Sequence, residues 1–287
     1  MIRLRPRDAL FPDRLGAIFD PPPSLYLRGG GDPELLASRS VAVVGARACS
    51  AYGAQVARML GRELASAGLV VVSGLARGID GEAHRGALDA SGPTLAVLGC
   101  GIDRDYPASH AQLSRRIEES GLVVSEYEPG VEPAPWRFPA RNRIIAGLSE
   151  AVVVVEARER SGALITADFA LDEGREVFAV PGEITSSLSA GTNALLKLGA
   201  TPLTSSDDVL DVLGVDRPDP SAAVEVSPQA ARLLELVREA PGGADELAAR
   251  GALAAGEASV ALTELELAGL VATADGVYRA AKAAGTR

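Results

Sequence analysis

Six short apolar runs recur between Val41 and about Gly214, and they set the strongest limit on what this chain can fold into. In order they read VAVVG, LVVVSG, TLAVLG, LVVSE, AVVVVE and EVFAVPG, and the stretches between them have the apolar period of amphipathic helices. A run of Val, Ile and Leu without polar alternation is typical of a strand buried on both faces, which needs helices on both sides of its sheet. The pattern therefore predicts an α/β fold with a doubly wound, Rossmann-like, mainly parallel sheet.

Changes in composition divide the chain into four predicted segments. Residues 1–40 are rich in Pro and Gly, hold one strand candidate, LYLRG, and are expected to form a lead-in that packs on the sheet. Residues 41–214 form the Rossmann-like domain. Residues 215–227 fall in GVDRPDPSAAVEVSP, whose Pro, Asp and small residues are typical of a linker. Residues 228–287 hold three helical segments and a short strand pair, the order of a small winged-helix domain.

Charge and composition exclude several classes of protein. A net charge of −10 and a sequence pI near 4.9 argue against a surface covered with nucleic-acid-binding charge, although a local basic cleft stays open. Only Lys197 and Lys282 are lysines among the 28 basic residues, and a GC-rich genome explains this bias, so only the positions of arginines are informative. Cys49 and Cys100 lack metal-ligand spacing and predict neither a disulfide nor a metal site. No signal peptide is recognisable and no apolar run is long enough to span a bilayer, so we expect a cytoplasmic protein with no membrane partner.

Arginines recur in the loops that follow the predicted strands. The carboxyl ends of parallel strands form the binding edge of such a sheet, where helix amino termini converge. The loops GARACSAYG, SGLARGIDGEAH, EARERSGALIT and PGEITSSLSAGTNALLK offer glycines and hydroxyl residues that let backbone N–H groups approach an anion. The arginines at these helix starts are Arg47, Arg77, Arg158 and Arg160, and we expect Arg141 and Arg143 to open the helix before the fifth strand. One such arginine would be an ordinary surface residue, but the repetition predicts a composite polyanion site.

Motifs of nucleotide-binding enzymes are missing from this predicted edge. No G-x-G-x-x-G follows the first strand, Ser73 stands where a ribose-binding acid is expected, and no G-x-x-x-x-G-K-[ST] is present. His84 and His110 have no Ser or Cys nucleophile at a recognisable spacing, and we interpret them as helix-surface or capping residues. We therefore predict no catalytic residue, no cofactor and no enzymatic activity.

Aromatic residues near these arginines favour a single-stranded nucleic acid as the polyanion. Trp136 and Phe138 precede the RNR triplet at 141–143, and Tyr52 and Tyr106 fall in loops at the binding edge. Proteins hold single strands by combining cations along the backbone with flat side chains on which bases stack, at ~1–3 kcal/mol per base. For Phe138, base stacking and core packing both stay open.

The same motifs, taken in order, closely resemble the DNA-processing protein A family (DprA, also called Smf). The similarity covers Leu10 to Leu213 and includes GARACSAYG, VVSGLARGIDGEAH, LGCGIDRDYP, SEYEPG, the long block from FPARNRIIAGLS through VPG, and GTNALLKLGA. The resemblance implies an extended Rossmann fold, a homodimer, and single-stranded DNA in the basic crevice. It also implies protection of incoming strands and loading of the RecA recombinase during recombination and natural transformation (competence). The family has no established catalytic centre.

The loop pattern and the resemblance together define the predicted nucleic-acid-binding residues. They comprise the GAR turn and the helix start after it, the serine–glycine turn, the RNR and RSG elements, and the GTN element with its following lysine. The predicted set is Gly45, Ala46, Arg47, Ser50, Ser73, Gly74, Arg77, Gly78, Phe138, Arg141, Asn142, Arg143, Arg160, Ser161, Gly162, Thr166, Thr192, Asn193 and Lys197.

Two features depart from the family pattern. Many members carry a helical domain, of helix-hairpin or SAM-like type, before the segment that begins here near Leu10. This chain has no room for such a domain, which predicts a short form or a truncated chain. The carboxyl-terminal winged helix also varies among relatives, so its role is the part least fixed by the resemblance.

The main alternative function is enzymatic. Rossmann-like proteins of the LOG type hydrolyse nucleoside monophosphates, and they resemble this chain around PGEITSSLSAGTNALL. Their pattern needs a glutamate three residues after the threonine, whereas Thr192 is followed at that spacing by Leu195. The catalytic carboxylate of that family is therefore missing.

A second alternative is a transcriptional regulator that uses the winged helix. Residues 225–287 carry nine acidic and six basic side chains, a net charge of −3, which is poor for a module that must neutralise phosphates. Its third helix, within GEASVALTELELAGL, places Glu264 and Glu266 where a DNA-reading helix needs donors and cations. We expect Leu262, Leu265, Leu267 and Leu270 to form the core of this module, and the module to contact protein with Val260 at the edge of the contact. A cut after Leu213 should leave most of the single-strand binding in place.

Overall fold

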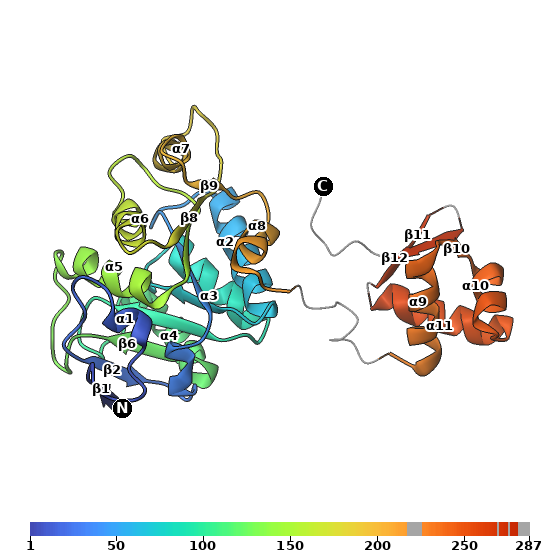
Figure 1. The fold of residues 1–287 in the computed structure, drawn as a ribbon, viewed down its shortest axis with the longest axis horizontal. Helices are drawn as coiled ribbons and strands as arrows, with labels where there is room; N and C mark the ends of the chain where they lie inside the picture. Colours follow the sequence, from blue (N-terminus) through green and yellow to red (C-terminus); the bar gives the residue numbers. More distant parts are fainter. Residues whose placement is uncertain (217–225, 269, 275, 281–287) are drawn as a thin grey trace. The chain divides into compact units, whose positions relative to one another are not determined.

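Two compact units make up the chain, Met1–Asp216 and Arg217–Arg287 (Figure 1). The computed structural model describes residues 1–216, 226–268, 270–274 and 276–280. Most of the predicted linker therefore lies outside the described residues. We call the first the Rossmann-like unit and the second the winged-helix unit.

A nine-stranded sheet forms the centre of the Rossmann-like unit, in the order β1-β2-β6-β5-β4-β3-β7-β8-β9. Its strands are β1 (Ile2–Leu4), β2 (Leu25–Arg28), β3 (Ser40–Val44), β4 (Val70–Ser73), β5 (Thr94–Leu98), β6 (Leu122–Ser125), β7 (Ala151–Val154), β8 (Glu176–Ala179) and β9 (Thr201–Pro202). Strands β3 to β9 pair in parallel, whereas β1 and β2 add an antiparallel edge through β6. The six apolar runs are confirmed as β3 to β8, and their side chains are buried on both faces except at Glu176.

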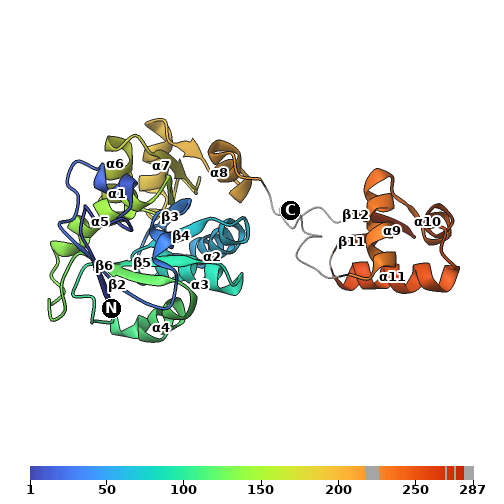
Figure 2. The same cartoon turned by 60° about the horizontal axis from the view of Figure 1, so that its bottom comes forward.

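Helices cover both faces of this sheet, as doubly buried strands require. They are α1 (Asp13–Gly16), α2 (Ala51–Ser66), α3 (Ile79–Asp89), α4 (Ala111–Ser120), α5 (Arg137–Leu148), α6 (Gly162–Asp172), α7 (Ala190–Lys197) and α8 (Ser206–Leu213), with a short 3-10 turn before α4. Apolar residues of α1, α5, α6 and α7 share one buried cluster with Val44 and Val152. Residues of α2, α3 and α8 share another with Val43 and Val153, and α4 packs beside them on Leu98 (Figure 2). The fold class predicted from the sequence is confirmed.

The lead-in segment is more regular than its sequence suggests. It contains β1, α1, β2 and a 3-10 helix at Pro33–Leu36. β2 pairs with β6, with Leu27 opposite Val124, so the segment extends the sheet and does not merely pack on it. Leu15, Leu25 and Leu27 are buried in the main core, but β1 and β2 have only three and four residues, which is too short for a strong periodic signal.

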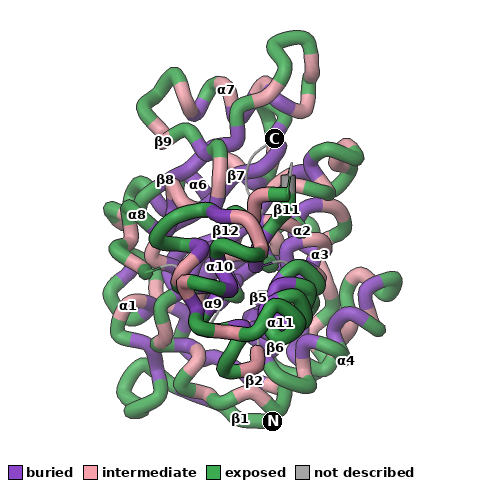
Figure 3. Tube along the Cα trace, turned by 90° about the vertical axis from the view of Figure 1, so that its right-hand side faces the viewer, coloured by how far each residue is buried: buried purple, intermediate pink, exposed green. Residues whose placement is uncertain are grey.

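The winged-helix unit has the predicted three helices and strand pair. They are α9 (Pro228–Glu239), α10 (Ala244–Gly251), α11 (Ala255–Leu267), β11 (Val271–Ala274) and β12 (Val277–Ala280), and a short β10 (Gly242–Gly243) pairs with β12. Leu233 and Leu247 belong to its core with the predicted Leu262, Leu265 and Leu270, whereas Leu267, also predicted there, is 86% exposed. Along α11 most residues away from this core are exposed (Figure 3). Within the described residues of either unit, every helix is too short or too polar to cross a membrane.

Candidate functional site

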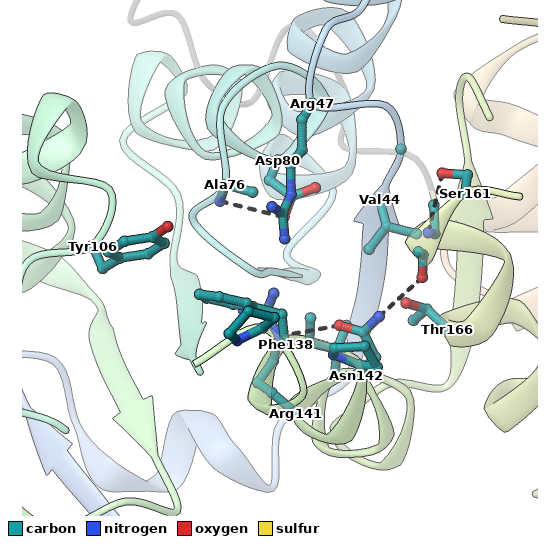
Figure 4. Close-up of a pocket in the computed structure, with 16 residues that line it drawn as sticks. Val44, Arg47, Ala76, Asp80, Tyr106, Phe138, Arg141, Asn142, Ser161 and Thr166 are labelled. Carbon is teal, nitrogen blue, oxygen red and sulfur yellow. Dashed lines mark hydrogen bonds between the residues drawn. The ribbon is translucent and has the colours of Figure 1, made fainter. Parts of the chain in front are cut away.

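A cavity of the Rossmann-like unit lies where the strand order changes direction. From β3 the chain proceeds to β4, β5 and β6 on one side of the sheet and to β7, β8 and β9 on the other. Ligands of doubly wound sheets bind at this switch point, outside the carboxyl ends of the strands. A cavity of about 450 Å³, which we call the crevice, is lined there by Val44, Gly45, Arg47, Ala76, Asp80, Tyr106, Pro135, Phe138, Pro139, Arg141, Asn142, Ile145, Ser161, Gly162, Ala163 and Thr166 (Figure 4).

The loop after β3 brings an exposed arginine to the crevice. Gly45 lies so close to its neighbours that a Cβ would be 2.6 Å from Ile79 Cγ1, so only glycine fits without displacing that side chain. Ala46 donates its N–H to the carbonyl of Glu156 at 2.7 Å, which holds the loop against the end of β7. Arg47, next in the chain, is exposed and projects over the crevice (Figure 4).

A cation and two aromatic rings lie together on one wall of the crevice. The guanidinium carbon of Arg47 is 5.2 Å from the centroid of the Phe138 ring. Tyr106 stacks on the same ring, with 5.2 Å between centroids and 27° between planes. Phe138 is half-buried, whereas Tyr106 is 40% exposed. A cation beside stacked rings provides both kinds of contact that single-stranded nucleic acids use.

A buried carboxylate shapes the loop after β4. Asp80 is 6% exposed and lines the crevice, and its Oδ2 accepts hydrogen bonds from the N–H groups of Gly74 at 3.2 Å and Ala76 at 3.4 Å. Burial raises the pKa of Asp80, and the nearby guanidinium groups of Arg141 and Arg47 oppose that rise. The same loop exposes Arg77 beside a smaller cavity of about 50 Å³ that also touches Arg47 and Gly74. Asp80 therefore fixes the backbone that carries Arg77.

Arg141 is buried beneath the crevice. It is 4% exposed, its Nη1 donates to the carbonyls of Gly74, at 2.8 Å, and Val97, and its Nε donates to Asn142 Oδ1 at 3.1 Å. Burial lowers the pKa of Arg141 to about 10, while the carboxyl of Asp80 acts in the opposite direction. Asn142 in turn donates from Nδ2 to the carbonyl of Gly162 at 3.0 Å. This chain of hydrogen bonds ties α5 to the loop after β4 and to the start of α6.

The expectation that Arg141 and Arg143 open their helix is wrong. Helix α5 begins at Arg137, so these two arginines lie in its second turn. Pro139 falls in the first turn of the helix, where a missing N–H costs no hydrogen bond, and so it does not mark the helix start.

Arg143 does not reach the crevice. Its Nη1 and Nη2 donate to the two carboxylate oxygens of Glu126 at 2.9 and 2.7 Å, and its Nε lies 2.9 Å from Asp20 Oδ2. It lines a separate cavity of about 300 Å³ with Phe19 and Phe169, among others. Its charge is already matched by two carboxylates of the protein.

The start of α6 faces the crevice. Ser161 caps the helix by accepting the N–H of Ala163 at 3.3 Å, and the first turn contains no acidic residue. Thr166 is 1% exposed and lines the crevice, and within the described chain its Oγ1 has no hydrogen-bond partner. Arg158 and Arg160 are exposed in the loop just before this helix. An uncompensated helix amino terminus beside two exposed arginines favours an anion.

Several predicted site residues do not line the crevice, and all of these except Lys197 hold the scaffold. Ser73 donates its hydroxyl to the Val43 carbonyl at 2.7 Å, and Ser50 caps α2. Gly78 adopts φ +77 at the N-cap of α3, next to the carbonyl of Ala46. Thr192 donates to the Ser189 carbonyl, Asn193 exchanges two hydrogen bonds with Gly182, and Lys197 is exposed in the last turn of α7.

Neither histidine lies on the surface, contrary to the sequence interpretation. His110 is the N-cap residue of α4, but its side chain makes no capping hydrogen bond. His84 is fully buried, with Nδ1 2.7 Å from Thr94 Oγ1, and burial lowers its pKa to about 3. His110 is 7% exposed, and its Nδ1 lies 3.0 Å from the Leu75 carbonyl. Neither lines the crevice, nor does Cys49 or Cys100. Across the described residues no group of three His, Cys, Asp or Glu side chains could hold a metal ion.

The predicted set omitted two polar residues of the crevice. Tyr106 was recognised only as an aromatic residue near the binding edge, because nothing in its local sequence shows that it stacks on Phe138. Asp80 lies in the first turn of a helix, where an acid is common and carries no special signal. Its burial beside Arg141 is visible only in three dimensions.

Comparison with known proteins identifies the family of both units. The model of the DNA recombination-mediator protein A family matches residues 3–214, and that of the DprA winged helix domain matches residues 217–276. DNA processing protein DprA of Streptococcus pneumoniae is 48% identical over 203 residues, which cover 71% of each chain. Protein Smf of Escherichia coli is 41% identical over 287 residues, covering 96% of this chain and 76% of the relative.

Solved structures agree with these sequence matches. The X-ray structure of DprA from Streptococcus pneumoniae superposes with a TM-score of 0.70 at 46% identity and covers 73% of each chain. DNA processing protein A from Helicobacter pylori, whose structure was described for its single-stranded DNA binding mode, gives a TM-score of 0.65 at 34% identity, covering 70% of this chain and 92% of that one. The family models match both the Rossmann-like unit and the winged-helix unit. This chain therefore belongs to the DNA recombination-mediator protein A (DprA/Smf) family of DNA-processing proteins.

Proposed function

We propose that this chain binds single-stranded DNA in the crevice, protects incoming strands, and loads RecA during recombination and natural transformation. The observation that carries the proposal is the wall formed by Arg47, Phe138 and Tyr106, where a cation and stacked rings lie side by side at the switch point of the sheet. Backbone phosphates would meet the arginines, and a base would stack on an exposed ring. The single-stranded DNA studied with the Helicobacter pylori relative supports the same ligand.

The arrangement of exposed charge supports a strand that crosses the crevice. Arg47 and Arg77 follow β3 and β4 on one side, and Arg158 and Arg160 follow β7 on the other. A polyanion lying across the carboxyl ends of these strands would meet cations on both sides. Each neutralised phosphate would release counterions, so binding should weaken as salt increases.

Hydrolysis of nucleotides is the less favoured function. At the position where LOG-type enzymes need a glutamate, Leu195 is 6% exposed, packs in the main core and does not line the crevice. Asp80 is a carboxylate at the crevice, but two backbone N–H groups and a neighbouring guanidinium engage it. We propose that the chain acts by binding, without a catalytic step.

Binding of three ligand classes at several salt concentrations tests this proposal. A single-stranded oligonucleotide, its duplex and free nucleotides would be compared by fluorescence anisotropy or by competition. We expect the single strand to bind most tightly, with log affinity falling linearly with log salt at ~0.7 per phosphate neutralised. Tighter binding of duplex, or turnover of a free nucleoside monophosphate, would refute it.

The partner proteins are proposed on the family resemblance. A homodimer would present two crevices to one strand and so bind long strands by avidity. Light scattering should then give twice the chain mass at concentrations where long strands bind tightly. RecA loading should appear as a shorter lag before RecA assembles on single-stranded DNA when this protein is present.

A further inference from the structure

A carboxylate of the protein itself occupies the amino terminus of α2. Glu156, two residues beyond the end of β7, is 5% exposed. Its Oε2 accepts the backbone N–H of Ser50 at 2.9 Å, and its Oε1 accepts the Ser50 hydroxyl at 2.5 Å. Ser50 is the N-cap of α2, and its Oγ accepts the N–H of Gly53 at 3.0 Å. The carboxylate thus binds the first turn both directly and through the capping hydroxyl.

The first turn of α2 is shaped to receive this carboxylate. A Cβ at Gly53 would overlap Cδ and Oε2 of Glu156, so a glycine at this position lets the helix approach the carboxyl group. The helix has no acidic residue of its own in its first turn. The amino terminus of this 16-residue helix carries a partial positive charge. Glu156, from the loop after β7, compensates that charge.

In other folds of this class, the amino terminus of the corresponding helix binds a ligand. In doubly wound sheets the turn after the first strand of the parallel order leads into a helix whose amino terminus binds the phosphate of a nucleotide. Here β3 is the strand at the switch point and α2 is the helix that follows it. Glu156 therefore stands where the phosphate of a bound nucleotide would be expected.

We infer that Glu156 is a specificity-determining residue that keeps free phosphates and nucleotides from the first β–α turn. With that terminus closed, the remaining anion-binding features of the crevice are the exposed arginines and the open start of α6, which hold a strand through many phosphates. A single nucleotide then lacks the helix amino terminus that would bind its phosphate most strongly, whereas a polyanion does not depend on that one contact. The part of this inference that concerns DNA rests on the proposed function, but the exclusion of phosphate does not.

The start of α6 provides an internal contrast. Both helices begin with a serine N-cap and lack an acid in the first turn. Ser161 and Thr166 of α6 line the crevice, whereas Ser50 and Gly53 of α2 do not. The difference between the two helix starts is the carboxylate that covers one of them.

Inorganic phosphate is the probe that tests the exclusion. Glu156→Ala and the near-isosteric Glu156→Gln would be compared with the unaltered chain in phosphate and in chloride at equal ionic strength. Thermal unfolding would be followed by the fluorescence of Trp136, the only tryptophan. We expect phosphate to leave the midpoint of the unaltered chain unchanged and to raise those of both variants, with a roughly tenfold gain in phosphate affinity for Glu156→Ala. Glu156→Gln supplies the test if the alanine variant does not fold.

Gly53→Ala provides a second, independent measurement. In the unaltered chain the added methyl must displace the carboxylate, so the unfolding midpoint should fall. In the Glu156→Ala background that space is vacant, and the same substitution should have little effect. An equal loss in both backgrounds would contradict the proposed packing.

The outcomes separate this inference from the proposed function. Phosphate that stabilises the unaltered chain as much as the variants, or that stabilises none of them, overturns the role of Glu156. A variant that gains phosphate binding while no form of the chain binds single-stranded DNA refutes the proposed function and leaves the role of Glu156 standing.

Discussion

Arginines on the rim of the crevice and arginines beneath it have opposite environments. The rim arginines, Arg47, Arg77, Arg158 and Arg160, are exposed, and within the described part of the chain none of them has an ion-pair partner. The buried arginines, Arg141 and Arg143, are engaged by carbonyl groups and carboxylates of the protein. In sequence both groups sit among the same small and aromatic residues. The comparison shows that arginine position along the chain does not reveal whether the charge is free.

Substitutions in the two groups of arginines should therefore have different effects. A buried guanidinium that loses its side chain leaves unpaired carboxylates or carbonyls, and the cost falls on the folded state. Removing an exposed guanidinium leaves no group of the protein unpaired, so the loss lowers only the affinity for a ligand. Stability and DNA binding are therefore separate readouts for the two groups.

Arg143→Ala should have the largest effect, on stability. The substitution leaves Glu126, whose side chain is 10% exposed, without its bidentate partner, and we expect a loss of ~3–5 kcal/mol in the free energy of unfolding. Urea unfolding followed by Trp136 fluorescence measures it, because this residue reports on the Rossmann-like unit alone. The salt dependence of DNA affinity should not change in the molecules that remain folded.

Arg116→Ala is the matched control for this measurement. Arg116 is exposed on α4, so its loss should change stability by no more than ~0.5 kcal/mol. A small effect of Arg143→Ala on stability, combined with a flatter salt dependence, would place Arg143 among the DNA-binding residues after all.

Arg141→Ala should lower stability by somewhat less, ~2–3 kcal/mol, and in a pH-dependent way. Burial already raises the pKa of Asp80, and removing Arg141 removes the largest interaction that opposes this rise. A carboxyl group whose pKa is higher in the folded state destabilises the fold as pH rises from its unfolded value towards its folded value. The penalty of Arg141→Ala should therefore be larger at neutral pH than in mild acid.

The pH dependence has its own control. In an Asp80→Asn background no carboxyl remains to titrate, so the cost of Arg141→Ala should be the same at both pH values. A cost that varies with pH even there would mean that another group is responsible.

The sequence predicted the sheet well because its signal is collective. Six runs with Val, Ile, Leu and Ala on both faces, separated by helical periods, leave few alternatives for strand and helix order. The lead-in was harder, because β2 is a short antiparallel strand whose partner, β6, lies about a hundred residues further along the chain. Pairing at that separation has no local signature.

The site was predicted less well because it depends on side-chain direction. Residues two positions apart on a helix point to opposite sides, so Arg141 and Arg143 enter different cavities. The role of Glu156 could not be predicted from the sequence either, because its partner Ser50 lies on a different loop.

Arg47→Ala should affect binding and leave stability unchanged. It removes one exposed cation and the partner of the Phe138 ring, so we expect roughly tenfold weaker single-strand binding and a salt slope smaller by ~0.7. Anisotropy titrations at several salt concentrations measure both, with Arg116→Ala again as the control. An unchanged slope would remove Arg47 from the phosphate contacts.

Removal of the winged-helix unit should have the smallest effect on DNA binding, although it deletes the most residues. The predicted cut after Leu213 is better moved to Asp216, because the N–H of Val215 bonds to the Leu210 carbonyl and its side chain packs on the core.

The surface of α11 gives the physical reason for expecting so little loss. Hydrogen bonds from Ser227 hold Glu264 and lower its pKa, Glu266 accepts the hydroxyl of Thr273, and α11 carries no basic residue. Such a helix would repel phosphates, whereas Val260 and Leu267, 71% and 86% exposed, are suited to contact another protein. The chain 1–216 should therefore keep its single-strand affinity within about twofold and the same salt slope. If it stays folded by circular dichroism and its Trp136 unfolding curve is unchanged, a hundredfold weaker affinity would mean that the rim arginines are not sufficient and that the winged-helix unit holds DNA as well.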